Sequence, residues 1–158
     1  MRLTSHTDFA LRLLMSLAVV DERLVTIEEL ATRHNLSRNH LMKVAQTLVG
    51  LGYVIGVRGR AGGLKLARPA ATIPMGEVVR ALEDDSRLVE CLGDGPSTCV
   101  LNGACVLTRS LGRAMEAFFA ELDEVTLADL VAPRLALRQR LGIGRPENRR
   151  PPASPVRP

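Results

Sequence analysis

Two helical segments joined by a tight turn, with a hairpin pattern directly after them, constrain the fold of this chain more than any other feature. The capping-box pattern Thr26-Ile-Glu-Glu29 predicts a helix over residues 27–34. A brief turn follows at residues 35–36, and Ser37 is a favourable N-cap for another helix that reaches about Leu51. A helix, a short turn and a second helix form the helix-turn-helix arrangement, in which the second helix reads DNA.

The hairpin pattern consists of residues 53–57 and 64–67, two runs typical of short β-strands, around the turn Arg58-Gly-Arg-Ala-Gly-Gly63. A hairpin directly after a recognition helix is a wing. Apolar residues at helical spacing also predict a first helix over residues 5–20. We therefore expect a mainly α fold with a small β-wing, in which residues 1–88 form a winged helix-turn-helix domain. The side chains expected in its core include Phe9, Leu13, Leu17 and Val20 of the first helix and Leu41, Val44, Ala45 and Leu48 of the third.

A longer helix is expected after this domain, because apolar residues from Ala104 to Val125 recur at steps of three and four. One helix cannot cover such a seam alone. Packing of part of the seam on the DNA-binding domain is one alternative, but we favour a homodimer in which the helix pairs with its copy. The remaining predictions are a helix over residues 77–88, a cysteine loop over 89–105, the dimerisation helix and a short C-terminal helix over 106–143, and a disordered basic tail over 144–158.

Basic residues are concentrated where the helix-turn-helix and the wing are predicted. No acidic residue occurs between Leu30 and Gly76, although the formal net charge of the whole chain is only +4. An acid-free surface suits a polyanion such as double-stranded DNA. Two such domains in a dimer predict a pseudo-palindromic operator, with half-sites about 10–11 bp apart or a multiple of that. The candidate DNA-binding residues lie in the first turns of the third helix and in the wing: Ser37, Arg38, Asn39, His40, Lys43, Arg58 and Arg60.

Several classes of function are disfavoured. Only 3% of the residues are aromatic and Trp is absent, which argues against recognition by stacking on exposed bases. The chain has no paired carboxylates, phosphate-binding loop or Ser/His/Asp set, so we do not expect an enzyme. No segment is typical of a signal peptide or a membrane span, and the odd number of cysteines does not suit a secreted disulfide framework. We therefore expect a cytoplasmic protein without a membrane partner.

Three cysteines lie within fifteen residues, at Cys91, Cys99 and Cys105. Free cysteines are most often buried structural thiols, but this segment is polar and irregular, which does not suit burial. Zinc favours compact C-x2–4-C pairs, which are missing, whereas an iron–sulfur cluster usually has thiolate ligands and tolerates wider spacing. We favour a cluster, with zinc or a thiol redox sensor as alternatives. A fourth ligand is not close in sequence, because Val106, Leu107 and Thr108 follow the last cysteine.

Together these motifs resemble a family of bacterial winged-helix repressors that carry an iron–sulfur cluster. The resemblance covers residues 1–132 and rests on MRLTSHTDFALRLL at the start, LSRNHLMKVAQTLVGLGYV through the third helix, GRAGGLKLARP in the wing, the cysteine loop and the closing VTLADLV. Members that regulate cluster assembly have a His three residues after the last cysteine, where this chain has Thr108. Members that sense nitric oxide have an Asp in the first helix, where this chain has Asp8, and they are the more similar group.

This resemblance implies a cluster held by Cys91, Cys99, Cys105 and Asp8, with [4Fe–4S] favoured over [2Fe–2S] and Asp8 reaching it across the dimer. It also implies a repressor that nitric oxide releases from DNA. Arg12 is a candidate contact of Asp8, because an Asp and an Arg four residues apart pair on a helix surface. The alternatives are a regulator on the same scaffold that responds to cluster supply, iron or redox state through a [2Fe–2S] cluster, an iron–sulfur electron carrier, and a zinc-stabilised adaptor.

Overall fold

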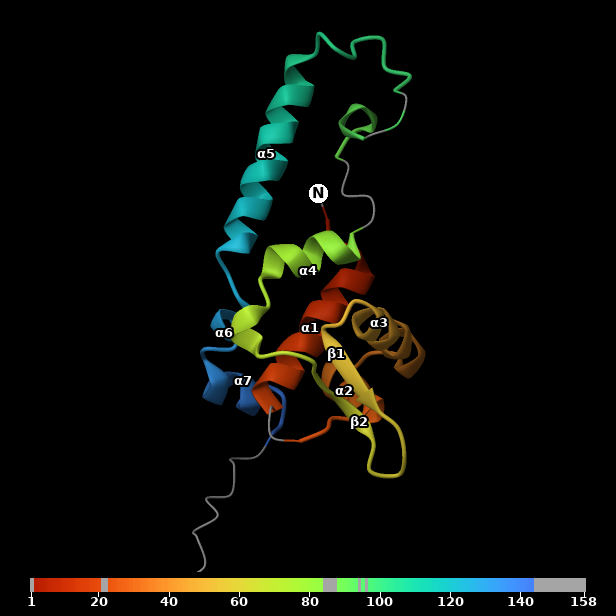
Figure 1. Cartoon of the computed structure of the whole chain (residues 1–158), viewed down its shortest axis with the longest axis vertical. Coiled ribbons are helices and arrows are strands. Elements are labelled where there is room, and N and C mark those ends of the chain that lie inside the picture. The colour runs from red at the N-terminus through yellow and green to blue at the C-terminus, as the bar shows by residue number, and fades with distance from the viewer. Residues whose placement is uncertain (1, 21–22, 84–87, 94, 96, 144–158) are drawn as a thin grey trace, which may run out of the picture.

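The computed structural model describes residues 2–20, 23–83, 88–93, 95 and 97–143. Within these residues it is mainly helical, with one two-stranded antiparallel sheet, which confirms the expected fold class (Figure 1). The predicted tail at residues 144–158 lies outside the described residues. The elements are α1 Ser5–Val20, α2 Ile27–His34, α3 Arg38–Gly50, β1 Val54–Val57, β2 Gly63–Leu66, η1 Ala70–Thr72, α4 Met75–Leu82, η2 Glu90–Leu92, α5 Val106–Asp123, α6 Leu127–Leu130 and α7 Arg134–Arg140.

Local signals define the start and the end of α2. The side-chain oxygen of Thr26 accepts a hydrogen bond from the backbone N–H of Glu29 at 3.1 Å, as the capping pattern predicts. The Glu29 carboxylate does not complete a capping box with the backbone N–H of Thr26. It accepts hydrogen bonds from the guanidinium groups of Arg23 and Arg33 instead. Asn35 ends the helix with a left-handed φ of 51°, a conformation that Asn adopts more readily than most residues.

The wing is a short hairpin that the rest of the domain holds at its base. Val54 pairs with Leu66 and Val57 with Gly63, so β1 begins one residue later than expected and β2 lies one residue earlier than expected at its full length. Val25, in the segment between α1 and α2, exchanges two backbone hydrogen bonds with Leu64, at 3.0 and 2.8 Å. The hairpin is therefore tied to the helix-turn-helix by backbone contacts, which sequence periodicity does not predict.

The hydrophobic core lies between α1, α3, the base of the wing and α4. The four core residues predicted for α3 are all buried. On α1, Leu13, Leu17 and Val20 are buried as predicted, whereas Phe9 is only half-buried because it lies at the edge of the core against α3. Leu14 and Val19 are buried as well, so α1 is covered on more than one face.

The C-terminal helices α6 and α7 cover a second face of α1. Leu127 of α6 is fully buried, and Val131 is 8% exposed in the same core. The backbone N–H of Leu127 donates to the carbonyl of Ile73, and Thr126 caps α6 with a complete capping box. The sequence analysis predicts a separate region over residues 106–143 that contains the dimerisation helix and a short C-terminal helix. In the structure α6 and α7 pack against α1, so this part shares the core of the N-terminal domain.

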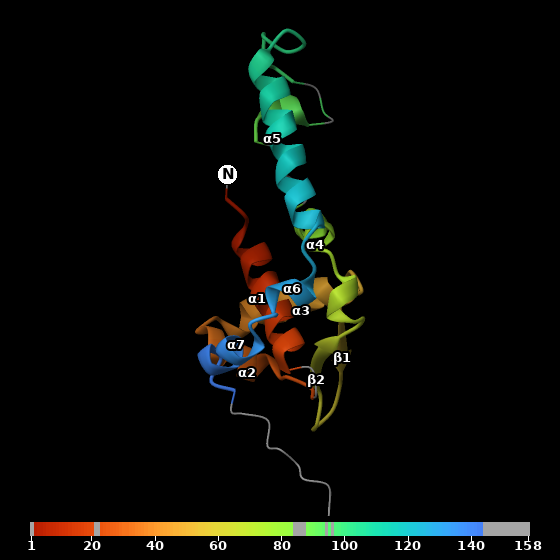
Figure 2. The ribbon, with the colours of Figure 1, turned by 90° about the vertical axis from the view of Figure 1, so that its left-hand side faces the viewer.

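The helix α4 is shorter than expected, because it runs from Met75 to Leu82 and not over residues 77–88. It begins directly after Pro74, a residue that is well suited to the start of a helix, and residues 84–87 lie outside the described part. The helix α5 begins at Val106 and ends at Asp123, within the apolar seam expected from Ala104 to Val125. Figure 2 shows that α5 extends away from the helix-turn-helix and the wing.

An ion pair joins the C-terminal end of α5 to α4. The guanidinium of Arg80 donates two hydrogen bonds of 2.7 Å to the Asp123 carboxylate and lies 4.6 Å from the ring centroid of Phe119. A Cβ on Gly76 would collide with the Asp123 carboxylate, so glycine is what allows this approach. No helix in the described part of the chain is long and apolar enough to cross a membrane.

Candidate DNA interface and metal centre

The first turns of α3 present every side chain that the sequence singled out there. Ser37 is the N-cap of α3, but within the described structure its hydroxyl makes no capping hydrogen bond and remains exposed. The four candidate DNA-binding residues that follow it in α3 are also exposed, while the opposite face of the helix packs in the core. The hydroxyl of the N-cap and the side chains that follow it are therefore free of the core, as contacts to phosphates or base edges require. The exposed residues are Ser37, Arg38, Asn39, His40 and Lys43.

Arg38 has a partner that the sequence analysis missed. Its guanidinium donates to the carboxylate of Glu28, which lies in the first turn of α2. Hydrogen bonds from its own backbone N–H and from Arg38 lower the pKa of Glu28. The two side chains are 60% and 61% exposed, so exchanging this ion pair for a contact with DNA costs little. Glu28 lies just outside the acid-free stretch, and its proximity to Arg38 depends on the angle between two helices.

The start of α3 also contacts the first half of α1. The ring centroids of Phe9 and His40 are 6.2 Å apart, and both residues border a small pocket of about 150 Å³. His6 of α1 and Lys43 of α3 line the same pocket. A displacement of the N-terminal half of α1 would therefore act directly on the residues that are candidates for reading DNA.

The turn of the wing places Arg58 and Arg60 in solvent. Gly59 between them has φ of 113°, a backbone conformation that favours glycine. A Cβ on Gly62 would approach the carbonyl oxygen of Val57 far too closely, so the turn closes only with glycine there. The wing therefore offers two cations on a thin turn, a shape that fits a narrow minor groove.

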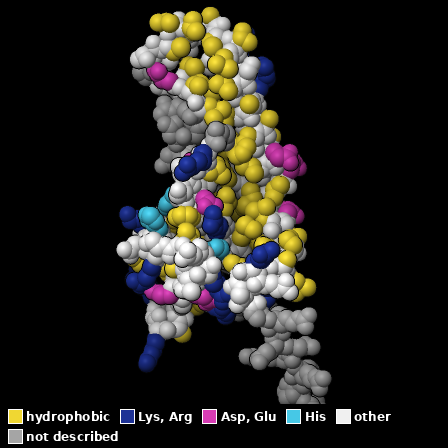
Figure 3. Space-filling view, turned by 180° about the vertical axis from the view of Figure 1, so that it is seen from behind, with side chains coloured by type: hydrophobic (Ala, Val, Ile, Leu, Met, Phe, Trp, Pro, Cys, Tyr) yellow, Lys and Arg dark blue, Asp and Glu magenta, His cyan; other side chains and the backbone are white. Residues whose placement is uncertain are grey.

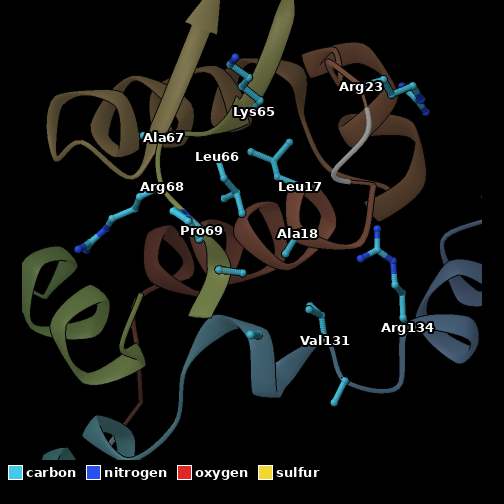
Figure 4. A pocket seen from close by; sticks show the side chains of 13 residues that line it. Leu17, Ala18, Arg23, Lys65, Leu66, Ala67, Arg68, Pro69, Val131 and Arg134 are labelled. Carbon is cyan, nitrogen blue, oxygen red and sulfur yellow. The ribbon is translucent and has the colours of Figure 1, made fainter. Parts of the chain in front are cut away.

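A larger pocket of about 690 Å³ lies on another side of the domain, between α1, β2, α6 and α7 (Figure 4). Leu17, Leu66 and Val131 contribute apolar walls, and Lys65 and Arg23 lie toward its edge. The second strand of the wing and the C-terminal helices thus border one hollow.

The three cysteines lie outside the core, at the far end of α5 from the wing. Cys91 is in η2, Cys105 is the N-cap of α5, and Cys99 lies in the loop between them. Cys91 and Cys105 are half-buried, whereas Cys99 is exposed. Among the described residues, no three His, Cys, Asp or Glu side chains are close enough to hold a metal ion together. The predicted ligand set is therefore not assembled within this single chain and stays a prediction.

Asp8 is in the first turn of α1 and forms the ion pair that its spacing from Arg12 predicts. The guanidinium of Arg12 donates two hydrogen bonds to the carboxylate, of 2.9 and 2.7 Å. Arg12 also lies 5.9 Å from the ring centroid of Phe9. Binding of a metal by Asp8 would require the carboxylate to leave this pair. The Asp8 side chain is 45% exposed, so the carboxylate is accessible from solvent.

An apolar face runs along α5 on the side seen in Figure 3. None of the described residues of α5 is fully buried, and Val106 and Leu107 are 65% and 62% exposed. Leu111, Met115 and Phe118 are only half-buried within this chain. The seam predicted from the sequence is therefore not covered by the chain's own core, apart from the contacts of α5 with α4 and η2.

Comparisons with known proteins give a family and its relatives. Residues 3–133 match the model of the Rrf2 family, described as iron-dependent transcriptional regulators. The HTH-type transcriptional regulator NsrR of Bacillus subtilis (strain 168) is 45% identical over 134 residues, which are 83% of this chain and 90% of that protein. The regulator of the same name from Geobacillus kaustophilus is 43% identical over 142 residues, 89% of this chain and 97% of that protein.

Solved structures have the same architecture. The oxidised form of CymR from Staphylococcus aureus matches with a TM-score of 0.67 and 27% identity, over 84% of this chain and 97% of that one. IscR from T. potens matches with a TM-score of 0.66 and 25% identity, over 84% of this chain and 88% of that one. The likeness therefore extends from the helix-turn-helix and the wing to most of the described chain.

Proposed function

The chain belongs to the Rrf2 family of iron-dependent transcriptional regulators, and from this premise we propose that it is a dimeric repressor whose iron–sulfur cluster senses nitric oxide. Membership in the family makes it a DNA-binding transcriptional regulator. The cofactor, the signal and the dimer are proposed from the arrangement of its residues. The observation that carries the proposal is the position of three thiols outside the core, around the start of the helix that rises from the DNA-binding domain.

The donor set of the cysteine loop fits an iron–sulfur cluster. Thiolates are the usual protein ligands of such clusters, and all three thiols of the chain are free and lie in one segment. Two of them flank the loop and are half-buried, and the exposed third one lies on the loop between them. Cys91, Cys99 and Cys105 would hold the cluster, and Asp8 is the proposed fourth ligand.

The proposed dimer uses the uncovered face of α5. A second copy of this chain is the partner that suits it, because the apolar seam spans about three heptads and a paired helix covers such a seam. We propose that the dimer brings Asp8 of one chain to the cysteine loop of its partner, since a single chain does not gather these ligands. Four ligands suit either cluster type, and we favour the [4Fe–4S] form because the chain resembles the family members that sense nitric oxide.

Nitric oxide is proposed as the signal on two grounds. Asp8 and Thr108 occupy the two positions at which the sensors of nitric oxide differ from the regulators of cluster assembly. Relatives named NsrR are 40% to 45% identical to this chain over most of its length. When it is bound, the cluster supplies iron that reacts with nitric oxide.

The chain's own residues connect that site to DNA. Asp8 lies on α1, and the next residue along the helix, Phe9, contacts His40 at the start of α3. A carboxylate that leaves the centre can pair with Arg12, as it does in the structure. Arg12 also lies over Phe9, so a change at Asp8 reaches a residue that touches the recognition helix. We propose that this contact lets the state of the centre set the position of α3 on its operator.

A native mass spectrum of protein purified without oxygen tests the cofactor and the dimer together. A dimer with four irons and four sulfides per chain is the expected result. Two irons per chain would instead favour a [2Fe–2S] regulator of redox state or cluster supply. Zinc, or freshly prepared protein without metal, would contradict the proposal and leave a DNA-binding dimer alone.

A gel shift with operator DNA, with and without nitric oxide, tests the signal. The Cys99→Ala variant should lose the cluster and operator binding. The matched control is Val100→Ala, because Val100 is 96% exposed in the same loop and has no thiol. This control should retain both properties. Full repression by Cys99→Ala would contradict the mechanism.

A further inference from the structure

Thr108 connects two of the three cysteines. It lies in the first turn of α5, and its hydroxyl oxygen is 3.1 Å from the sulfur of Cys91, which precedes it by 17 residues. The residue is half-buried, so the contact is partly shielded from water. Cys105, the N-cap of the same helix, lies within the same turn. The contact therefore ties Cys91, at one end of the cysteine loop, to the helical turn that begins at Cys105, at the other end.

The surroundings of Cys105 favour its thiolate. The nearby Thr108 side chain is the main cause that lowers the pKa of this thiol, and the backbone of Thr108 and Leu107 and the charge of Arg109 act in the same direction. These groups would equally stabilise a sulfur that binds a metal, because a metal-bound thiolate still accepts hydrogen bonds.

We propose that Thr108 is a positioning residue of the metal centre, whose hydroxyl holds Cys91 next to Cys105 and donates a hydrogen bond to a metal-bound sulfur. This inference rests on the proposed function, because it needs Cys91 and Cys105 to be ligands. A threonine hydroxyl has one donor hydrogen and two acceptor lone pairs. In the metal-free chain it can accept from the thiol of Cys91 while it donates to Cys105. When both sulfurs are thiolates, it can donate to only one of them.

The three cysteines differ in whether they are held in place before a metal binds. Thr108 already holds Cys91 at the turn of α5 that begins with Cys105 before any metal is present, whereas Cys99 lies exposed on the loop. This end of α5 is a preformed half of the centre that the loop cysteine completes. Residues that orient metal ligands by hydrogen bonds typically change metal affinity by about 10- to 100-fold when they are removed.

Binding of Co²⁺ alone by the reduced, metal-free, full-length protein tests this role, because sulfur-to-cobalt absorption bands report the bound thiolates. Thr108→Val has the shape of threonine without its hydroxyl and should weaken Co²⁺ binding by about tenfold or more. Thr108→Ser retains the hydroxyl and should bind like the original chain. The matched control is Ser110→Ala, which removes a hydroxyl of α5 that accepts a hydrogen bond from Arg113.

A second readout separates positioning from simple packing. In protein reconstituted with iron and sulfide, Thr108→Val should shift the iron–sulfur stretching frequencies and the reduction potential, and Thr108→Ser should not. Circular dichroism checks that each variant is folded. Thr108→Ala, which also lacks the hydroxyl and suits a helix, repeats the test if the valine variant does not fold.

The possible failures are distinguishable. Equal Co²⁺ affinity and equal spectra of the original chain and Thr108→Val would overturn the role of Thr108 and leave the proposed cluster intact. Equal losses in Thr108→Val and Thr108→Ser would also overturn it, because the hydroxyl would then not be the active group. If the original chain itself shows no sulfur-to-cobalt absorption, the proposed function fails, and this inference fails with it.

Discussion

Replacing Asp8 by asparagine separates the two roles of this side chain, as the partner of Arg12 in the fold and as a candidate ligand of the metal centre. The variant keeps the size of the side chain and removes its charge. The structure allows the first role to be given a magnitude. The second role then becomes measurable as an effect on the centre that the loss of stability does not explain.

The loss of stability is expected to be small. An Asp–Arg pair four residues apart on a helix stabilises it by about 0.2–0.5 kcal/mol. The side chains of Arg12 and Asp8 are 46% and 45% exposed, so solvent screens the pair. A carboxylate in the first turn of a helix contributes about 0.3–1 kcal/mol through the helix dipole. Together these contributions predict a decrease of about 0.5–1.5 kcal/mol in the free energy of unfolding, which leaves a domain of ordinary stability folded.

Urea unfolding of the metal-free protein measures this decrease, and stopped-flow absorption of the reconstituted protein measures its reaction with nitric oxide. The expected result is a rate changed by about tenfold or more, the scale on which altered metal surroundings act. Asp123→Asn is the matched control, because it breaks a bidentate pair with Arg80 whose side chains are 46% and 42% exposed. It should not alter that rate.

Two results would refute this reasoning. An unchanged reaction of Asp8→Asn with nitric oxide, together with unchanged cluster absorption, would remove Asp8 from the centre. A decrease in stability well above about 1.5 kcal/mol would show that the carboxylate has a structural role beyond the exposed pair with Arg12.

Three further predictions concern DNA binding, pH and the core. Arg58→Ala combined with Arg60→Ala should weaken operator binding and reduce the slope of log affinity against log salt by about 1 for each phosphate that is no longer neutralised. The control Arg113→Ala on α5 should leave both unchanged. Salt titrations followed by fluorescence anisotropy measure the slope, and equal slopes for the wing variant and the original chain would exclude the wing from the interface. Burial, followed by the charges of Arg12 and Arg33, lowers the pKa of His34, so below about pH 6.5 the unfolded chain binds a proton that the folded chain does not. Stability should fall as the pH decreases from about 6.5 towards the folded pKa, and His34→Gln should flatten this dependence in thermal unfolding curves. Leu127→Ala should lower the free energy of unfolding by about 2–5 kcal/mol, and a value near zero would mean that α6 is not part of the core.

Local signals made most of the secondary structure predictable. The bounds of α2 follow from Thr26 at one end and the turn at Asn35 at the other, and those of α1 from apolar spacing. The buried face of α3 is predictable residue by residue, because a helix that packs on a core repeats its apolar side chains every three or four positions. The end of α4 is not, because nothing in the sequence up to residue 88 marks where that helix stops.

The candidate sites also combine features that the sequence predicts with features that it does not. Exposure of the first turns of α3 and of the wing arginines follows from the helix-turn-helix pattern and its turn residues. The pair of Arg38 with Glu28 does not, because it depends on how two helices are set against each other. The contact of Thr108 with Cys91 likewise joins residues on opposite sides of a long loop.

The order of the amino acids was enough to predict most of the helices and strands, the basic segments and the side chains that are suited to bind DNA or a metal. These properties depend on neighbours within a few residues, so spacing and capping residues define them. Three contacts are visible only in the folded chain: α6 and α7 cover α1, the segment before α2 pairs with the wing, and Thr108 contacts Cys91. Such contacts depend on the path of the whole chain, because many different closures of a long loop are compatible with the same local pattern.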